Sequence, residues 1–241
     1  MALTDPSPEC LLLHGFTGCA EDWRTLTGQD RTRLAVDLPG HGRRGDPRGT
    51  FRDEIQALLQ ELPTSIERVV GYSFGGRLAL GLIQAAPARF RAATIISAHP
   101  GLTDPLLREQ RREADRRWIQ LLRTQGIDAF VQGWEKLPLF ATQGHLSRSV
   151  LARQRACRLS QRAEGLASCL ERLGLAEMPG TWDDLMRFPG QLRWIVGGED
   201  RKFLRLARQV AERRPTTDLR VLEGVGHNPL LESPDRLTDL L

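Results

Sequence analysis

The sequence predicts an α/β protein built on a doubly wound, mostly parallel β-sheet. Three observations carry this prediction: short apolar runs have the length of buried strands, helical patterns separate most of them, and turn residues follow the runs. Because parallel strands need crossover connections, we expect the carboxyl ends of these strands to meet along one edge of the sheet. The six expected strands cover residues 10–13, 34–38, 66–70, 92–96, 192–196 and 219–222.

The first two expected strands end in loops that carry histidine and glycine. The first continues into His14-Gly15-Phe16-Thr17-Gly18 and the second into Pro39-Gly40-His41-Gly42. In folds with a catalytic serine on such a sheet, the loop after the first of these strands supplies a backbone N–H to an oxyanion hole, and here that N–H belongs to Phe16. We interpret the histidines of both loops as structural.

The third expected strand leads into Gly71-Tyr72-Ser73-Phe74-Gly75, and an apolar helix follows it as far as Pro87. A Gly-x-Ser-x-Gly turn between a strand and a helix is the context of a nucleophile elbow in the α/β-hydrolase fold. The glycines allow a sharp bend that projects the serine hydroxyl above the sheet, at the amino end of the helix. We therefore predict Ser73 as a catalytic residue and the N–H of Phe74 as a second oxyanion donor.

Two further loops supply the partners that such a serine needs. The fifth expected strand continues into Gly197-Gly198-Glu199-Asp200, and the sixth into a turn that contains His227. The chain order Ser, acid, His is that of α/β-hydrolases, in which the histidine takes the serine proton and the acid orients the histidine. We predict a triad of Ser73, Asp200 and His227, with Glu199 as an alternative acid that spacing alone leaves open.

The chain is rich in arginine, and one arginine lies where charge is unexpected. Of 34 basic residues only Lys136 and Lys202 are lysine, and the net charge is +4. Without a contiguous basic face this balance does not indicate nucleic-acid binding. Arg77 is the one charge between Ser73 and Ala86, and it lies one helical turn after the serine. A buried guanidinium needs an anion, which either the protein or the substrate must supply.

The segment between the fourth and fifth expected strands is helical and arginine-rich. We expect a single domain over residues 1–241 in which approximately residues 100–189 form a lid, inserted after what is usually the sixth strand of this fold. A helix should begin after Asp104, and Arg111 falls within its apolar stripe, which continues through Leu107, Ala114, Trp118 and Leu121. Inward arginines in a lid indicate a small, multiply anionic substrate.

A third inward arginine is predicted further along the lid. Arg155 lies between Leu151 and Leu159 at helical spacing, and Arg158 and Arg162 remain alternatives for the same role. Each of these arginines could instead lie along the surface or form an internal salt bridge.

The chain resembles the 2-succinyl-6-hydroxy-2,4-cyclohexadiene-1-carboxylate synthases, the pyruvate-releasing lyases of menaquinone and phylloquinone biosynthesis, from its first strand to its carboxyl end. It departs from their pattern at Phe74, where leucine is usual, at Leu230, where a second histidine often stands, and in lacking an opening hairpin. The motifs that carry the resemblance are residues 13–18, 37–42, 71–77, 99–102, 115–118 and 226–228, with Trp134, Pro138 and Phe140.

The resemblance implies that the triad acts as a base, which removes a proton next to a succinyl ketone while an enolpyruvyl group leaves as pyruvate. A serine hydrolase of esters or carbon–carbon bonds, or a ligand receptor without catalysis, remain the alternative functions. The residues carried over by motif are the triad Ser73, Asp200 and His227, the carboxylate-binding Arg77, Arg111 and Arg155, and the pocket-lining Tyr72 and Trp134.

Composition indicates the cellular compartment, the cofactors and the partners that we expect for this protein. The segment from Met1 to Glu9 is polar, and no apolar run has the length of a membrane span. The four cysteines show no spacing typical of a metal or redox site, so we expect reduced thiols, a cytoplasmic protein without metal or organic cofactor, and a monomer. The expected partner is a multiply anionic small molecule rather than a nucleic acid or a membrane. The cysteines are Cys10, Cys19, Cys157 and Cys169.

Overall fold

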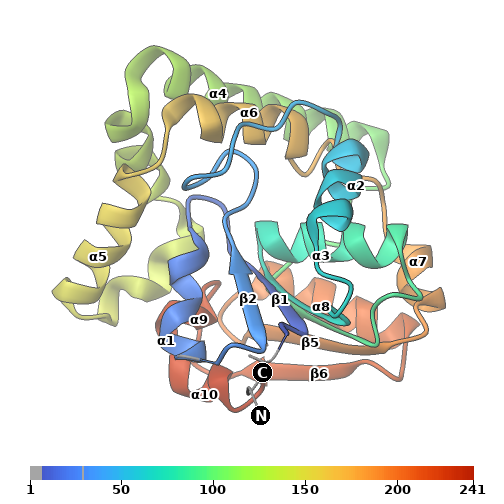
Figure 1. Cartoon of the computed structure of the whole chain (residues 1–241). Coiled ribbons are helices and arrows are strands. Elements are labelled where there is room, and N and C mark those ends of the chain that lie inside the picture. Colours follow the sequence, from blue (N-terminus) through green and yellow to red (C-terminus); the bar gives the residue numbers. More distant parts are fainter. Residues whose placement is uncertain (1–6, 29) are drawn as a thin grey trace, which may run out of the picture.

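A computed structural model of the chain describes residues 7–28 and 30–241, so most of the polar amino-terminal segment lies outside the described residues. The described part contains a six-stranded sheet in the order β2-β1-β3-β4-β5-β6, with every neighbouring pair parallel (Figure 1). This confirms the predicted parallel sheet, although β3 begins two residues later than expected. The strands are β1 Cys10–Leu13, β2 Arg33–Val36, β3 Arg68–Tyr72, β4 Ala92–Ile96, β5 Gln191–Gly197 and β6 Asp218–Leu222.

The sheet separates two hydrophobic cores, because successive side chains of a strand point to opposite faces. In β1, Leu11 and Leu13 belong to one core, whereas Cys10 and Leu12 belong to the other. All four are buried, as expected for a parallel strand that is covered on both faces.

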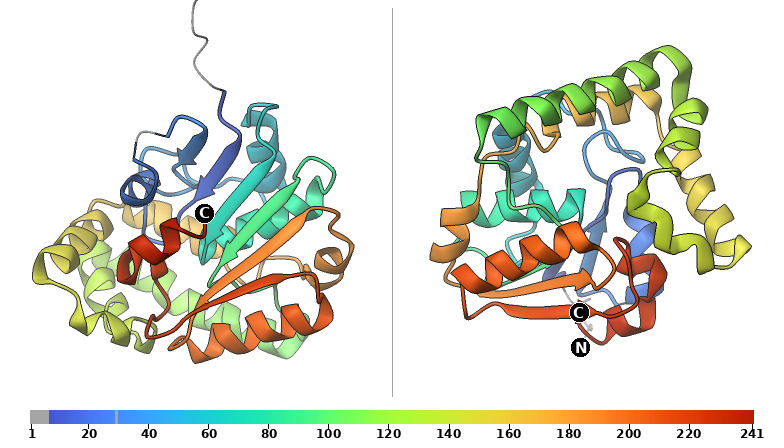
Figure 2. Two further views of the ribbon diagram at one scale, coloured as in Figure 1. Left: turned by 90° about the horizontal axis from the view of Figure 1, so that it is seen from below. Right: turned by 180° about the vertical axis from the view of Figure 1, so that it is seen from behind.

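Helices cover both faces of the sheet (Figure 2). Buried residues of α2 Phe51–Glu61, α3 Phe74–Ala85, α7 Trp182–Arg187 and α8 Arg201–Arg213 belong to the larger core. On the other face, the smaller core takes Trp23 from the 3-10 helix η1 Ala20–Trp23 and residues of α1 Arg24–Thr27, α9 Pro229–Glu232 and α10 Pro234–Thr238. The predicted doubly wound arrangement is therefore correct.

A helical insertion joins β4 to β5 and lies across one edge of the sheet (Figures 1 and 2). The carboxylate of Asp104 accepts the N–H groups of Leu106 and Leu107, so the first helix of the insertion begins where the sequence predicts. This helix bends at Gly126, whose φ of 78° lies outside the helical region. The helices are α4 Pro105–Trp134, the 3-10 helix η2 Pro138–His145, α5 Arg148–Leu159 and α6 Ala163–Leu173.

The predicted apolar stripe of α4 is wrong at its amino end. Leu107 is 48% exposed and lies outside the cavity on the inner side of the helix, whereas Ala114 and Trp118 line that cavity beside Arg111. Further along, α4 packs against α6, and Leu122 is buried there. Among the described residues, no helix is long and apolar enough to cross a membrane.

Candidate active site

The turn between β3 and α3 holds Ser73 in a strained backbone conformation, with φ 50° and ψ −104°. Close backbone packing makes this turn possible. A Cβ on Gly71 would lie 2.4 Å from the carbonyl oxygen of Gly75, and one on Gly75 would lie 2.2 Å from that of Leu13. A non-glycine residue at positive φ is costly, and such strain is concentrated at functional sites. The geometry is that of a nucleophile elbow.

The structure brings Ser73, His227 and Asp200 together from three separate loops. The Nε2 atom of His227 lies 3.0 Å from Ser73 Oγ, and its Nδ1 atom lies 2.6 Å from Asp200 Oδ2. Both His227 and Asp200 are buried, whereas Glu199 is exposed. The carboxylate that contacts the histidine is therefore that of Asp200. With Nδ1–H donated to Asp200, Nε2 is free to accept the proton of the serine hydroxyl.

Phe16 and Phe74 lie beside this serine. The N–H of Gly75 donates to the carbonyl of His14 at 3.0 Å, which joins the first loop to the elbow. Phe74 is the first residue of α3, where a backbone N–H has no acceptor within the helix. The N–H of Thr17 donates to His41 Nε2 at 3.1 Å and so fixes the loop that carries Phe16.

His14 and His41 support the loops as neutral rings. The N–H of Leu38 donates to His14 Nε2 at 3.0 Å, and His41 donates from Nδ1 to the carbonyl of Pro39 at 3.0 Å. Burial lowers the pKa of His14 to about 4 and, together with the charge of His14, the pKa of His41 to about 3. A ring that must accept a backbone hydrogen bond is better neutral than charged, so these histidines position the loops.

A cavity of about 280 Å³ opens from Ser73 toward α4, and positive charge gathers in it. Arg77 is buried there, with Nη1 donating to the carbonyl of Leu173 at 2.8 Å and its guanidinium over the ring of Phe74. Burial, and secondarily the charge of Arg111, lowers the pKa of Arg77 to about 10. No carboxylate among the described residues forms an ion pair with Arg77, and Asp115, which pairs with Arg111, acts on its charge only at longer range.

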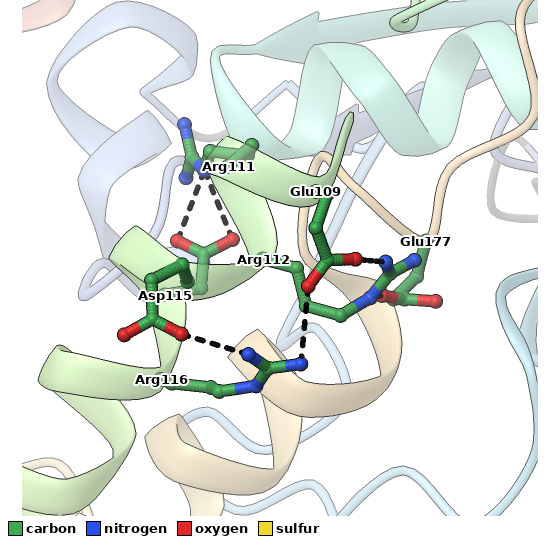
Figure 3. A network of polar contacts seen from close by, with 7 residues as sticks. Glu109, Arg111, Arg112, Asp115, Arg116 and Glu177 are labelled. Carbon is green, nitrogen blue, oxygen red and sulfur yellow. Dashed lines mark hydrogen bonds and ion pairs between the residues drawn. The ribbon is translucent and has the colours of Figure 1, made fainter. Parts of the chain in front are cut away.

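Arg111 enters the same cavity from the lid. Its Nε atom donates to both carboxylate oxygens of Asp115, at 3.0 and 2.9 Å. Figure 3 shows that its two terminal nitrogens point away from that carboxylate. The neighbouring Arg112 instead pairs with Glu109 and Glu177, and Arg116 pairs with Glu109 and Glu113. Figure 3 shows the contacts of both arginines with Glu109. Arg111 therefore faces the cavity, in keeping with its position in the expected apolar stripe, whereas Arg112 and Arg116 do not line the cavity.

Lys202 also lines this cavity, and sequence reasoning missed it. It lies in the first turn of α8, two residues after Asp200. Burial, and then the charge of Arg111, lowers its pKa. As one of only two lysines in the chain, and the one beside the predicted acid, it could have been singled out from the sequence.

A second, smaller pocket of about 70 Å³ lies on the other side of Ser73 and is lined by Tyr72, Trp134 and Arg158. The side chain of Arg158 is 6% exposed, whereas that of Arg155 is 44% exposed; both pair with Glu135. The expectation that Arg155 faces the site is therefore wrong, and Arg158, one of its two alternatives, lies there. The reason is helical phase, because Gln154, Cys157 and Arg158 form the inward face of α5. The other alternative, Arg162, pairs with Asp46 outside both pockets.

The parallel sheet, the strained serine turn and the Ser–His–Asp arrangement define an α/β hydrolase. A sequence model described as the alpha/beta hydrolase family matches residues 10–240, and the chain belongs to this family.

Comparison with known proteins narrows the family further. The chain is 32% identical to the 2-succinyl-6-hydroxy-2,4-cyclohexadiene-1-carboxylate synthase of Escherichia coli O1:K1, over 94% of this chain and 89% of that one. It is 29% identical to a protein named as a putative synthase of the same kind from Bacillus subtilis strain 168, over 97% of this chain and 90% of that one. The structure of MenH from S. aureus superimposes with a TM-score of 0.92 at 26% identity, covering 99% and 93% of the two chains. The chain belongs to the family of these synthases.

Proposed function

We propose that this protein eliminates pyruvate from 2-succinyl-5-enolpyruvyl-6-hydroxy-3-cyclohexene-1-carboxylate to give 2-succinyl-6-hydroxy-2,4-cyclohexadiene-1-carboxylate. Family membership supports this reaction. The observation that carries the proposal is the gathering of Arg77, Arg111 and Lys202 in the cavity that contains Ser73. An ester hydrolase needs only the triad and an oxyanion hole, whereas a polyanionic substrate needs fixed cations as well.

The proposed substrate carries three carboxylates, and the two pockets offer cations on both sides of the serine. Within the described part of the chain no carboxylate pairs directly with Arg77, and the terminal nitrogens of Arg111 point away from Asp115. Arg158 provides a further guanidinium in the smaller pocket. Guanidinium groups hold carboxylates through paired hydrogen bonds, which fixes orientation as well as charge. We propose that Arg77, Arg111 and Arg158, assisted by Lys202, orient the substrate against Ser73.

The triad would then act as a base. The proton at ring carbon 2, next to the succinyl ketone, passes to Ser73 Oγ while the serine hydroxyl gives its own proton to His227 Nε2. The electrons of the broken C2–H bond form a C2–C3 double bond, the C3–C4 double bond moves to C4–C5, and the C5–O bond breaks. Enolpyruvate leaves and becomes pyruvate on protonation. Asp200 stabilises the charged imidazole during this transfer.

Before those electrons move into the ring, loss of the proton would give an enolate, which places negative charge on the ketone oxygen. The backbone N–H groups of Phe16 and Phe74 would donate hydrogen bonds to this oxygen, in the way an oxyanion hole stabilises a tetrahedral intermediate. Tyr72 and Trp134 line the smaller pocket, where they would pack against the apolar faces of the substrate.

The direct test is to supply the enolpyruvyl substrate and follow pyruvate with lactate dehydrogenase and NADH. Wild-type protein should release pyruvate, and Ser73→Ala should release almost none. Replacing the hydrogen at ring carbon 2 with deuterium should slow release if that proton is removed in the reaction. Turnover that is unchanged by Ser73→Ala would contradict the proposal.

A further inference from the structure

Two cysteines that are far apart in the sequence lie in contact at the edge of the smaller pocket. The Sγ atoms of Cys19, in the loop before η1, and Cys157, on lid helix α5, are 3.4 Å apart. Asp22 joins them, with Oδ1 at 4.0 Å from Cys19 Sγ and 3.9 Å from Cys157 Sγ. These three atoms form a compact triangle of potential metal ligands. The spacing of the cysteines in the sequence gave no sign of it.

The size of the triangle matches one face of a tetrahedral zinc site. Zinc binds cysteine sulfur at about 2.3 Å and carboxylate oxygen at about 2.0–2.2 Å, which at the tetrahedral angle places the ligand atoms about 3.5–3.8 Å apart. The observed separations are 3.4, 3.9 and 4.0 Å. Small side-chain movements would bring them into this range. A disulfide needs a sulfur separation of about 2.0 Å, which is a much larger change.

The chemistry of the three groups also suits a divalent, thiophilic cation. Asp22 Oδ2 accepts the backbone N–H of Cys19 at 3.1 Å, which leaves Oδ1 directed toward the two sulfurs. Cysteine sulfur and carboxylate oxygen are both ligands that zinc binds in proteins. Arg153, Arg158 and Asp37 are the other charged groups that act on Asp22. Two thiolates and a carboxylate around a divalent ion would keep a net negative charge. The two arginines would stabilise that charge.

A buried glutamine holds the two sides of this cluster in place. The Nε2 atom of Gln161 donates to the carbonyl of Gly18 at 3.1 Å and to that of Cys157 at 3.4 Å. Its Oε1 atom accepts the N–H of Gly42 at 2.9 Å. Polar groups that orient ligand-bearing segments are typical of metal sites that are formed before the metal arrives.

We propose that Cys19, Asp22 and Cys157 form a Zn²⁺ site with an open fourth position toward the smaller pocket. Three protein ligands and one open position are the arrangement of zinc sites that also bind water or a substrate group. Gly18, Asp22 and Cys157 line the same pocket as Ser73, so the open position faces the solvent of that pocket. A bound ion would tie lid helix α5 to the loop that carries Phe16. This inference does not depend on the proposed reaction.

The test uses Co²⁺ as a spectroscopic substitute for Zn²⁺. It is added to the full chain in a buffer that contains a phosphine reductant, which keeps the cysteines reduced. One equivalent should bind and give thiolate-to-metal and tetrahedral absorption bands, and Zn²⁺ should displace it. Cys19→Ser and Cys157→Ser should each weaken binding at least about a hundredfold, and Asp22→Asn about tenfold, while the matched control Cys169→Ala binds like wild type. Asp22→Asn keeps the hydrogen bond to the N–H of Cys19, so it separates ligand loss from loss of local structure.

Hydrogen exchange gives a second readout that reports on the lid. Bound Zn²⁺ should slow exchange in α5 and in the loop before η1 in wild type, but not in Cys157→Ser. Absence of thiolate-to-metal bands, or equal binding by wild type and Cys157→Ser, would overturn the proposal. The proposal would also be overturned if, without the reductant, the chain formed a Cys19–Cys157 disulfide instead of binding metal. Mass spectrometry would detect that disulfide as the loss of two hydrogens.

Discussion

The backbone N–H of Arg77 donates to the carbonyl of Ser73 at 3.1 Å, which places the serine and the guanidinium one helical turn apart on α3. Both side chains line the same cavity. A cation held by the element that also presents the serine has a fixed position relative to the serine hydroxyl. This relationship links the triad to the recognition of an anionic substrate.

Removing members of the triad should abolish turnover without unfolding the protein. We expect Ser73→Ala and His227→Ala each to lower kcat for pyruvate release by several orders of magnitude, because proton transfer needs both groups. Asp200→Asn should cost less than either. Glu199→Gln is the matched control, since that carboxylate is exposed. Circular dichroism checks the fold, and a larger loss in Glu199→Gln than in Asp200→Asn would contradict the assignment of the acid.

Loss of an arginine that lines the cavity should lower kcat/KM far more than loss of an arginine on the exposed face of α4. A hydrogen bond to a charged group contributes roughly 1.5–3 kcal/mol, so Arg77→Ala and Arg111→Ala should each lower kcat/KM roughly ten- to a hundredfold. Arg77→Lys should recover part of the loss, because it restores charge but not the planar fork. The control is Arg116→Ala, whose side chain pairs with Glu113 on the exposed face of α4. Similar losses in all of these variants would indicate bulk electrostatics instead.

Arg158 and Arg155 offer a closely matched comparison. Both contact Glu135, but only Arg158 is buried in the smaller pocket. We expect Arg158→Ala to raise KM or lower kcat/KM at least about tenfold, and Arg155→Ala to have little effect, because an exposed ion pair contributes little. Steady-state kinetics of pyruvate release by the two variants measures this difference. The reverse order would restore the role that the sequence suggested for Arg155.

Stability should fall as the pH drops below neutral. Burial lowers the pKa of His14 and His99 to about 4 and that of His41 to about 3, against 6.5 when unfolded. The unfolded chain therefore binds more protons near pH 6, and the free energy of unfolding decreases as pH falls through 6.5 toward 4. Asp22 opposes this loss of stability in part. The protein atoms around its carboxyl group displace water and raise its pKa to about 6, so the folded chain binds an extra proton there.

The size of this pH effect follows from the balance of protons. Near pH 6 each of the three buried histidines takes up most of a proton on unfolding, and the exposed Asp22 offsets only part of this uptake, so the free energy of unfolding should rise by roughly 2 kcal/mol per pH unit. Urea denaturation at pH 7.0 and 5.5 measures it. Equal stability at the two pH values would show that these histidines are not held neutral in the folded chain.

The parts of the site that depend on local sequence could be predicted. The glycines around Ser73 and the loops after β5 and β6 located the elbow, Asp200 and His227, because strand ends in a parallel sheet converge on one edge. The family assignment was confirmed by the comparisons. Helical phase in the lid was harder to predict. Neighbouring arginines differ by about 100° around a helix, so Arg155 and Arg158 could be separated only by the packing of α5.

Two other features of the fold left no signal in the sequence. Cys19 and Cys157 are 138 positions apart, and they meet only because α5 folds back over the first loop. Leu107 lies in an apolar pattern but is exposed, because it falls outside the cavity that Arg111, Ala114 and Trp118 line. Both outcomes depend on tertiary packing, which no periodicity in the sequence encodes.

The most direct test of the central claim is to measure Arg77→Ala on two substrates. The claim is that cations beside the triad, rather than the triad alone, make this protein a pyruvate-releasing lyase. We predict that the substitution lowers kcat/KM for pyruvate release roughly ten- to a hundredfold but leaves the slow hydrolysis of a neutral p-nitrophenyl ester unchanged, because that ester has no carboxylate for Arg77 to hold. An equal loss on both substrates, or rapid ester hydrolysis by a wild-type protein that forms no pyruvate, would contradict the claim.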